Sequence, residues 1–430
     1  MRPIFALAIA LLMAPVPIRA QGFDWQAHKG ETIDFLTENH PWSNAVVTRL
    51  ADFTKLTGIT VRVDSLQEAQ MRQRAATLLQ SKSSSFDAFM SLKSFEGTLY
   101  ASAGWYADIG AMAADTKLTD PGYNLIDFGA GLRAGETFNG KLDGIPLNIE
   151  GPIVYYRKDI FEKCNIAPPT TLDALRAAAA TIKACDTSII PFAARGLKIA
   201  VPYVLSNVIH NMGGDYFASG KPALCGGVGE KAIDWYAGML KDFGPPGSVN
   251  NSFLQLRELY GQGRVAMIFE SSNEFGEIMK FAHRADDTQV MLLPPGPGGS
   301  HPTIIGWGLS INAFSKKQDA AWLFVQWATS KAMDGELALA GIAPPRASVA
   351  ISPDYQKFLA ASPLRQVWAA LLDNMGRTGN PEVGPPVTRQ PQAREIIGDA
   401  VDQVLLGTAS AHDAACGADQ AITAMLNAGN

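Results

Sequence analysis

The apolar positions near the start of the chain change from a period of two to a helical period and back again. Residues 32–36 alternate apolar and polar side chains, and residues 46–53 carry apolar side chains at helical spacing. Gly58, a common type of residue at a helix end, is followed by renewed alternation over residues 59–63. Alternation at every second residue is typical of a strand, so this segment is predicted to be a β-α-β unit.

A second unit repeats this order of strand and helix. Residues 172–183 have helical spacing after a capping-box-like start at Thr170 and Asp173, and an apolar strand over residues 188–194 follows. Such alternation predicts parallel sheets with helices on both faces. Ligands of these sheets bind beyond the C-terminal ends of the strands, so the loops there are the first place to look for function.

Residues 144–163 read as a buried strand that continues past Gly151-Pro152 into a short helix. Proline cannot donate a hydrogen bond to a central ladder, and glycine relaxes the backbone at that point. The interruption therefore suits a chain that passes from one lobe of a protein to another.

The first 20 residues have the layout of a cleavable secretory signal. Arg2 precedes an apolar run over residues 4–13, and the segment ends in Ile18-Arg19-Ala20. The run is too short to span a bilayer, and a buried N-terminal helix of the fold is the alternative interpretation. The residue directly after the expected cleavage point at Ala20 is Gln21 and not a cysteine, which argues against a lipid-anchored form. We therefore expect a periplasmic protein that loses residues 1–20 and is not a lipoprotein.

Length and charge narrow the class of protein. About 410 of the 430 residues remain after the signal, which is enough for two globular lobes. The formal net charge of −5 gives no basic footprint for nucleic acid. Nucleic acid is therefore not an expected partner.

The four cysteines lack the close paired spacing of a zinc or redox motif. In an oxidising compartment an even number is better explained by two disulfides. The sequence leaves three pairings open, and the one that joins Cys164 to Cys185 is favoured because a single predicted helix separates them. The candidates are Cys164, Cys185, Cys225 and Cys416.

The chain shows no sign of an enzyme. It has no Gly-x-Ser-x-Gly elbow and no His-Glu-x-x-His helix, and its six histidines are scattered without metal-ligand spacing. A secreted hydrolase stays the less favoured alternative. No metal ion or cofactor is expected.

Five segments carry a resemblance to a known family. In order and spacing they resemble the extracellular solute-binding proteins (family 1) of carbohydrate transporters of the ATP-binding cassette (ABC) type, which include maltose-binding periplasmic proteins. The segments are residues 144–175, 86–109, 261–272, 305–316 and 341–348.

The resemblance implies an α/β fold of two lobes, with mostly parallel sheets flanked by helices and three crossovers between the lobes. It also implies a monomer that closes reversibly on a solute and delivers it to the permease of an ABC importer in the inner membrane. The crossovers are expected near residues 148–152, 308–312 and 341–346. The expected lobes are residues 22–148 plus 311–342 (N-terminal) and 149–310 plus 343–430 (C-terminal).

Carbohydrates are bound by aromatic faces and by planar polar groups in a concave site. Trp307 is the strongest candidate, because its flanking glycines allow a close approach. By resemblance, Glu150 matches a carboxylate that accepts sugar hydroxyls, and Tyr203 matches a stacking aromatic. The full set of candidates is Asn39, His40, Trp42, Ser91, Lys93, Asn148, Glu150, Arg195, Tyr203, Glu270, Ser272, Gly306, Trp307 and Arg346.

Some of these candidates could have a structural role in place of ligand binding. Trp42 could pack in a turn, Lys93 could be a solvated loop residue, Glu150 could form a hinge salt bridge and Tyr203 could pack within a helix. Trp235, Trp322 and Trp327 lie in helix-like runs and are expected in the core.

The loops carry fewer aromatic residues than a maltodextrin site would need. A monosaccharide, polyol or short oligosaccharide is therefore expected as the ligand in place of a long glucan. A receptor for an amino acid or polyamine is the alternative within the class of binding proteins.

Overall fold

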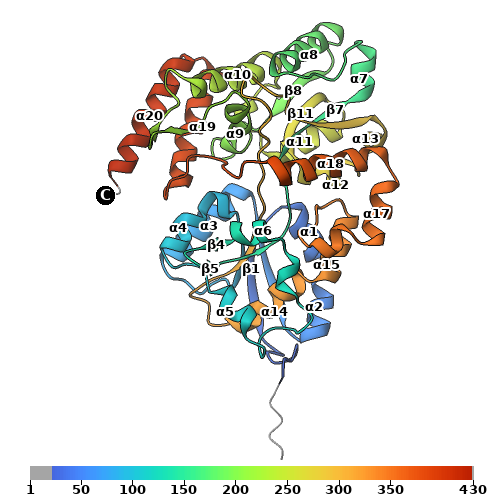
Figure 1. The fold of residues 1–430 in the computed structure, drawn as a ribbon, viewed down its shortest axis with the longest axis vertical. Helices are drawn as coiled ribbons and strands as arrows, with labels where there is room; N and C mark the ends of the chain where they lie inside the picture. The colour runs from blue at the N-terminus through green and yellow to red at the C-terminus, as the bar shows by residue number, and fades with distance from the viewer. Residues whose placement is uncertain (1–21, 429–430) are drawn as a thin grey trace, which may run out of the picture.

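The computed structural model describes residues 22–428, which form two lobes (Figure 1). The predicted signal, residues 1–20, lies outside the described residues. Each lobe is built on one central sheet with helices packed against it. The strand order is β2-β1-β3-β13-β6 in the N-terminal lobe and β12-β7-β11-β8 in the C-terminal lobe.

The N-terminal lobe contains the predicted β-α-β unit. β1 pairs in parallel with β2 and with β3, so that Phe35 lies opposite both Val63 and Ala88. The helical part consists of two helices, and Gly58 ends the second with a φ of 73°. The strands are β1 (Thr32–Glu38), β2 (Thr60–Leu66), β3 (Ala88–Ser91), β6 (Ile145–Pro146) and β13 (Gly308–Ile311), and the two helices are α1 (Pro41–Val47) and α2 (Leu50–Thr57).

The C-terminal lobe contains the second predicted unit. Its helix begins at Leu172, as predicted, but the capping residue is Thr171 in place of Thr170, because the hydroxyl of Thr171 accepts the backbone N–H of Ala174 at 3.0 Å. The strands are β7 (Pro152–Arg157), β8 (Ile190–Ala194), β11 (Val265–Ser271) and β12 (Thr288–Leu292), and the helix is α8 (Leu172–Cys185).

Both sheets are mixed, so the expectation of mostly parallel sheets is wrong in this detail. β11 is parallel to β8 but antiparallel to β7, and β13 is antiparallel to both β3 and β6. The reason is that β7 and β13 enter their sheets from the other lobe. They begin at the edge where the neighbouring strands end, and they therefore run in the opposite direction.

Helices and short hairpins complete the lobes. The remaining helices are α3 (Glu68–Gln80), α4 (Thr98–Ser102), α5 (Ile109–Ala114), α6 (Ala130–Gly135), α7 (Lys158–Lys163), α9 (Val201–Asn211), α10 (Val228–Phe243), α11 (Phe253–Gly261), α12 (Phe275–Ile278), α13 (Arg284–Asp287), α14 (Gln318–Ala328), α15 (Lys331–Leu339), α16 (Ala347–Ala350), α17 (Pro353–Ala360), α18 (Pro363–Thr378), α19 (Gln390–Leu406) and α20 (Ala411–Asn427). The short turns and hairpin strands are η1 (Lys93–Gly97), η2 (Leu125–Asp127), η3 (Ser248–Asn250), η4 (Ser272–Glu274), β4 (Thr137–Phe138), β5 (Lys141–Leu142), β9 (Phe217–Ala218) and β10 (Lys221–Pro222). None of the helices within residues 22–428 is long and apolar enough to cross a membrane.

Aromatic side chains fill the core of the N-terminal lobe. The ring of Phe324 on α14 lies 5.1 Å from that of Phe35 on β1 and 5.5 Å from that of Phe53 on α2. The three tryptophans expected in the core are buried, as predicted: Trp235, Trp322 and Trp327.

The segments between the two sheets lie close to the expected crossovers. The first passes from β6 to β7 over residues 147–151, where 148–152 was expected. By Gly308 the second has already joined the N-terminal sheet as β13, and Arg346 still donates to the carbonyl of Thr329 in the N-terminal lobe at 2.8 Å. We therefore propose lobe boundaries near residue 307 and after residue 350, in place of 310 and 342.

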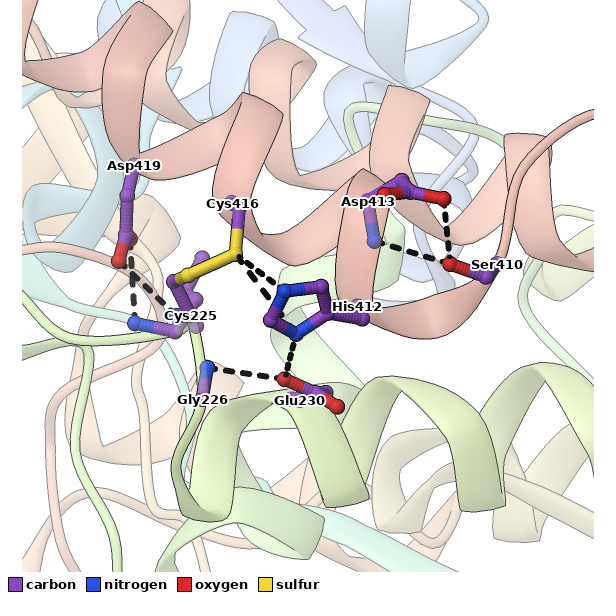
Figure 2. Close-up of a disulfide and its surroundings, with 9 residues drawn as sticks. Cys225, Gly226, Glu230, Ser410, His412, Asp413, Cys416 and Asp419 are labelled. Atoms are coloured by element: carbon purple, nitrogen blue, oxygen red, sulfur yellow. Dashed lines mark hydrogen bonds and ion pairs between the residues drawn. A yellow bond between two sulfur atoms is a disulfide. The ribbon is translucent and has the colours of Figure 1, made fainter.

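Two disulfides join parts of the C-terminal lobe. Cys164 pairs with Cys185 across α8, which confirms the favoured pairing. Cys225 pairs with Cys416 and links the loop before α10 to α20, as Figure 2 shows. Residues 22–428 contain no free cysteine.

Candidate functional site

A narrow cavity lies between the two lobes, and side chains from both lobes line it. The loops after β1 and β3 contribute from the N-terminal lobe, while the ends of β8 and β11 contribute from the C-terminal lobe. The lining residues are Glu38, His40, Glu68, Leu92, Phe95, Glu150, Arg195, Tyr203, Phe253, Ser271, Glu274, Ile305, Trp307, Val383 and Arg394.

Five of the predicted ligand residues line this cavity. His40 follows β1 and Arg195 follows β8, which agrees with the rule that sites lie beyond the C-terminal ends of strands. Tyr203 lies on α9, and Glu150 and Trp307 lie on the first two crossovers. These five residues come from strand ends, from α9 and from the first two crossovers.

Trp307 is held in place by backbone contacts to the first crossover. Its N–H donates to Oδ1 of Asn148 at 3.0 Å, and its carbonyl accepts the N–H of Leu147 at 2.8 Å. A side chain at Gly306 would come within 2.7 Å of the carbonyl of Asn148, so glycine is required for this close approach. Asn148 and Gly306 do not line the cavity but position the indole that does.

Two further predicted residues support the wall without lining it. Glu270 is fully buried and accepts hydrogen bonds from Nε of Arg195 at 2.9 and 3.0 Å. Ser272 accepts the N–H of Gly151 at 3.2 Å and so ties β11 to the first crossover. Both residues stabilise the groups that face the cavity.

The other predicted residues make contacts elsewhere. Asn39 accepts a hydrogen bond from Ser65 at 3.0 Å, Ser91 bonds the hydroxyl of Tyr106 at 2.6 Å, and Lys93 donates to Ser310 at 2.6 Å. Trp42 is buried in the core of the N-terminal lobe, and Arg346 lies among backbone carbonyls and Asp127. The solvated loop position considered for Lys93 is wrong, because its ammonium is buried 3.4 Å from Glu136.

Several lining residues were missed. Glu68 begins α3 just after β2, so the strand-end rule could have found it. Phe95 lies in η1, and Phe253 begins α11. Arg394 lies within the long helix α19, and no local pattern in the sequence indicates that α19 reaches the cavity.

Arg195 is the centre of a charged network that spans the lobes. Its guanidinium pairs with Glu270 below the cavity and lies 3.9 Å from Glu68 of the N-terminal lobe. It also lies 4.4 Å from the centre of the Tyr203 ring. Burial opposes the positive charge, but Glu270 outweighs it and raises the pKa of Arg195.

A second arginine organises the N-terminal wall. Nη2 of Arg72 lies 3.0 Å from Oε1 of Glu68, and Nη1 pairs with Glu96. Its guanidinium carbon lies 4.0 Å from the ring centre of Phe95 and 4.8 Å from that of Trp307. Burial disfavours the charge of Glu68, but Arg72 and Arg195 outweigh burial and lower its pKa.

Burial raises the pKa of each of the other carboxyls that line the cavity. Burial raises the pKa of Glu150 to about 7, despite its hydrogen bond from Ser271, and raises that of Glu274 to about 8. Burial also raises the pKa of Glu38, whose Oε2 has no hydrogen-bond partner among residues 22–428. A protonated carboxyl can donate as well as accept, so these groups suit a ligand that carries hydroxyls.

The aromatic groups and the histidine add a second type of contact. Trp307, Phe95, Tyr203 and Phe253 offer rings to the cavity, and the hydroxyl of Tyr203 has no partner within the described chain. Burial lowers the pKa of His40 to about 3, so the imidazole is neutral. The cavity thus combines ring faces with buried donors and acceptors, the features of a site for a small polar solute.

Comparison with known proteins agrees with this arrangement. A family model described as "Bacterial extracellular solute-binding protein" matches residues 37–334. The chain is 27% identical to the mannitol-binding protein of Pseudomonas aeruginosa, over 96% of this chain and 95% of the relative. It is also 27% identical to the erythritol/L-threitol-binding protein of Mycolicibacterium smegmatis, over 72% of this chain and 69% of the relative.

Solved structures share the same two-lobed fold. A solute-binding protein of Agrobacterium vitis with bound D-mannitol has a TM-score of 0.81 at 26% identity, covering 93% of this chain and 99% of that one. A protein of Agrobacterium radiobacter in complex with ribitol has a TM-score of 0.80 at 24% identity, covering 91% and 98%. The fold, the cavity between the lobes and the family match agree, and the chain belongs to the bacterial extracellular solute-binding proteins.

Proposed function

We propose that this protein is a periplasmic receptor that captures a small polyol or monosaccharide in the interlobe cavity and delivers it to an ABC importer. The observation that carries the proposal is that one cavity, walled by both lobes, offers aromatic rings beside carboxyls whose pKa burial raises to about 7 and about 8. Two relatives whose names refer to mannitol and to erythritol or threitol support the same class of solute.

The size of the cavity favours a small ligand. In this structure the space that the centre of a water-sized sphere can occupy is only about 20 Å³. Arg394 of the C-terminal lobe lies 4.0 Å from the ring of Phe95 in the N-terminal lobe, which limits the space further. A single acyclic polyol or sugar ring therefore suits this cavity better than an oligosaccharide.

The partners and location follow from the same proposal. The receptor would act as a monomer in the periplasm after removal of residues 1–20, and it would dock on the permease subunits of the importer. Family membership is that of binding proteins, so no turnover of chromogenic glycosides is expected.

A cationic solute is the second candidate. Four glutamates line the cavity, and a relative from Sinorhizobium fredii, 25% identical over 88% of this chain, is named as a probable amino-acid transporter binding protein. Arg195 and Arg394 oppose this alternative, because both are buried in the same wall.

A thermal-shift screen separates the two candidates. The panel contains mannitol, ribitol, erythritol, monosaccharides, maltose, amino acids and polyamines. A ligand present at a hundred times its dissociation constant stabilises the folded protein by about 2.7 kcal/mol, which raises the melting temperature measurably. Stabilisation by polyols or monosaccharides supports the proposal, whereas stabilisation by amines or amino acids alone contradicts it.

A further inference from the structure

A histidine and two carboxylates meet beside the cavity, at the C-terminal end of α9. The candidate ligand atoms of His210, Asp215 and Glu382 all lie within 4.8 Å of one another. His210 lies in the last turn of α9, Asp215 follows that helix, and Glu382 lies in the loop between α18 and α19. Segments far apart in the sequence therefore bring three metal-binding side chains together.

His210 is suited to bind a metal ion. His210 is a buried member of the group, with 5% of the residue exposed. A neutral ring nitrogen is the form that binds metals. The side-chain nitrogen of Asn380 lies 3.4 and 3.3 Å from the two ring nitrogens. One ring nitrogen of a neutral imidazole can bind a metal only if the other carries the proton, so metal binding would displace this amide contact.

The two carboxylates have no cationic partner within 4.0 Å in the described part of the chain. Asp215 accepts the N–H of Tyr216 at 2.6 Å, and the backbone N–H of Glu382 is satisfied by Oδ1 of Asn380 at 2.9 Å. Two acids whose oxygens lie within 4.8 Å of each other, with no cationic side chain beside them among residues 22–428, would be stabilised by a bound cation.

We propose that His210, Asp215 and Glu382 bind a divalent transition-metal ion of the Zn²⁺ class. Imidazole together with carboxylate is a donor set that such ions accept, whereas Ca²⁺ and Mg²⁺ prefer oxygen ligands throughout. Water would complete the coordination, since Asp215 is exposed. This inference does not depend on the identity of the transported solute.

The backbone around the site is well fixed. The N–H of Asn380 donates to Pro302 at 2.8 Å, and the N–H of Ile304 donates to Asn380 at 3.0 Å. The N–H of Gly213 closes the end of α9 by donating to the carbonyl of His210 at 2.9 Å.

Zn²⁺ binds nitrogen and oxygen at about 2.0–2.2 Å, so its ligands lie at most about 4 Å apart. Small rotations of the two acidic side chains would bring all three atoms into range.

The site adjoins the proposed solute cavity. Val383, which lines the cavity, directly follows Glu382, and its carbonyl accepts a hydrogen bond from Arg394. A metal ion at Glu382 would tie this part of the wall to α9, the helix that also carries Tyr203. The ion would thus act on the shape of the cavity without contacting the solute.

A second group of metal-binding residues provides a control. Cys225, His412 and Cys416 also lie together, but Figure 2 shows that the two sulfurs form a disulfide. Nδ1 of His412 lies 3.0 Å from Glu230. With the disulfide intact this group offers one imidazole, so it should contribute little to specific metal binding.

The test is calorimetric titration of the purified mature protein with Zn²⁺ alone, without reductant and after treatment with a chelator. We expect one Zn²⁺ per chain in the wild type, at least tenfold weaker binding in Asp215→Asn and in Glu382→Gln, and a larger loss in the double variant. Glu230→Gln, at the control group, should bind Zn²⁺ as the wild type does. Both acidic positions are at least partly exposed, and melting curves in chelator should show that the variants fold normally.

Two results would overturn the proposal. One is the absence of stoichiometric Zn²⁺ binding by the wild type, and the other is equal binding by the wild type and the Asp215→Asn/Glu382→Gln double variant. Parallel titrations with Mg²⁺ and Ca²⁺ address the class of ion. Tighter binding of either one than of Zn²⁺ would contradict the assignment of a transition metal.

Discussion

His40 of the N-terminal lobe and Asn273 of the C-terminal lobe meet across the cleft, with Nε2 of the imidazole 3.0 Å from the side-chain amide of Asn273. His40 follows β1 and caps α1, where its Nδ1 accepts the N–H of Trp42 at 3.2 Å. Asn273 lies in η4, directly after β11. The contact therefore joins the ends of two strands from opposite lobes.

The hydrogen bond at Nδ1 fixes the tautomer of His40. Because Nδ1 accepts, the proton of the neutral ring resides on Nε2, which must donate to Asn273. We assign the amide oxygen of Asn273 as the acceptor, since the two orientations of an amide are distinguished by their hydrogen bonds. This orientation also gives a partner to Oδ1 of Asn273, which is otherwise buried without one among residues 22–428.

Replacement of Trp307 by alanine should weaken solute binding without unfolding the protein. The indole lines the cavity, and truncation of a well-buried aromatic contact costs on the order of 1–3 kcal/mol of binding free energy. Calorimetry with the solute found by thermal shift measures the change. Trp105→Ala is the matched control, because Trp105 packs on Tyr100 away from the cavity. Unchanged affinity in Trp307→Ala would assign Trp307 to packing alone.

The sequence predicted those parts of the fold that depend on patterns among residues close together in the chain. The β-α-β unit over residues 32–66 follows from apolar periodicity, and the first crossover follows from the Gly151-Pro152 interruption. Four of the five predicted residues that line the cavity lie at strand ends or crossovers, where general rules for α/β sheets apply, whereas Tyr203 lies on α9.

The residues that were missed or misplaced depend on contacts between distant segments. Arg394 reaches the cavity because α19 docks beside η1, and its own helix gives no sign of this. Lys93 was considered a loop residue, but Glu136 and Ser310 from distant segments surround its ammonium. Such pairings are set by tertiary packing, so periodicity and spacing carry no information about them.

The stability of the unliganded protein should depend on the protonation of Glu150. Its pKa is about 7 in the folded state and about 4.3 in an unfolded chain, so the folded state binds more protons between these values. Stability should therefore fall as pH rises from 5 to 8, and Glu150→Gln should reduce this fall by on the order of 2 kcal/mol. Urea unfolding at several pH values measures it, with exposed Glu258→Gln as control. Parallel curves for wild type and Glu150→Gln would refute the assignment.

Removal of the Arg195 guanidinium should destabilise the fold as well as the site. Arg195→Ala leaves Glu270, which is fully buried, without its cation, and breaking such a pair costs about 3–5 kcal/mol. Adding Glu270→Gln to Arg195→Ala should restore part of the stability by removing the uncompensated charge. Denaturant unfolding should show little change for Arg62→Ala, since its pair with Asp34 is exposed. Equal effects of Arg195→Ala and Arg62→Ala would contradict this account.

The two disulfides should differ in their contribution to stability. Cys225–Cys416 closes a loop of 191 residues, whereas Cys164–Cys185 closes one of 21. In the chain-entropy model the longer loop stabilises by about 2 kcal/mol more. Unfolding of the two double Cys→Ser variants tests this difference, and the native wild type should show no mass gain after thiol alkylation. A larger loss on removing Cys164–Cys185 would show that native-state contacts outweigh loop entropy.

Closure of the lobes on the solute should reduce the radius of gyration. The lobes contact each other in this structure: His40 contacts Asn273, and Arg195 lies 3.9 Å from Glu68. Both contacts would be lost if the lobes separated. A solute that touches both walls can shift the equilibrium only by its difference in affinity for the closed and open forms. Asn273→Ala removes one closing contact, worth roughly 0.5–1.5 kcal/mol, and should weaken binding several-fold.

Small-angle scattering with and without solute measures closure. The control variant is Asn374→Ala, because the hydrogen bond of Asn374 to Thr378 stays within α18. An unchanged profile at saturating solute, together with wild-type affinity in Asn273→Ala, would show that binding does not require closure.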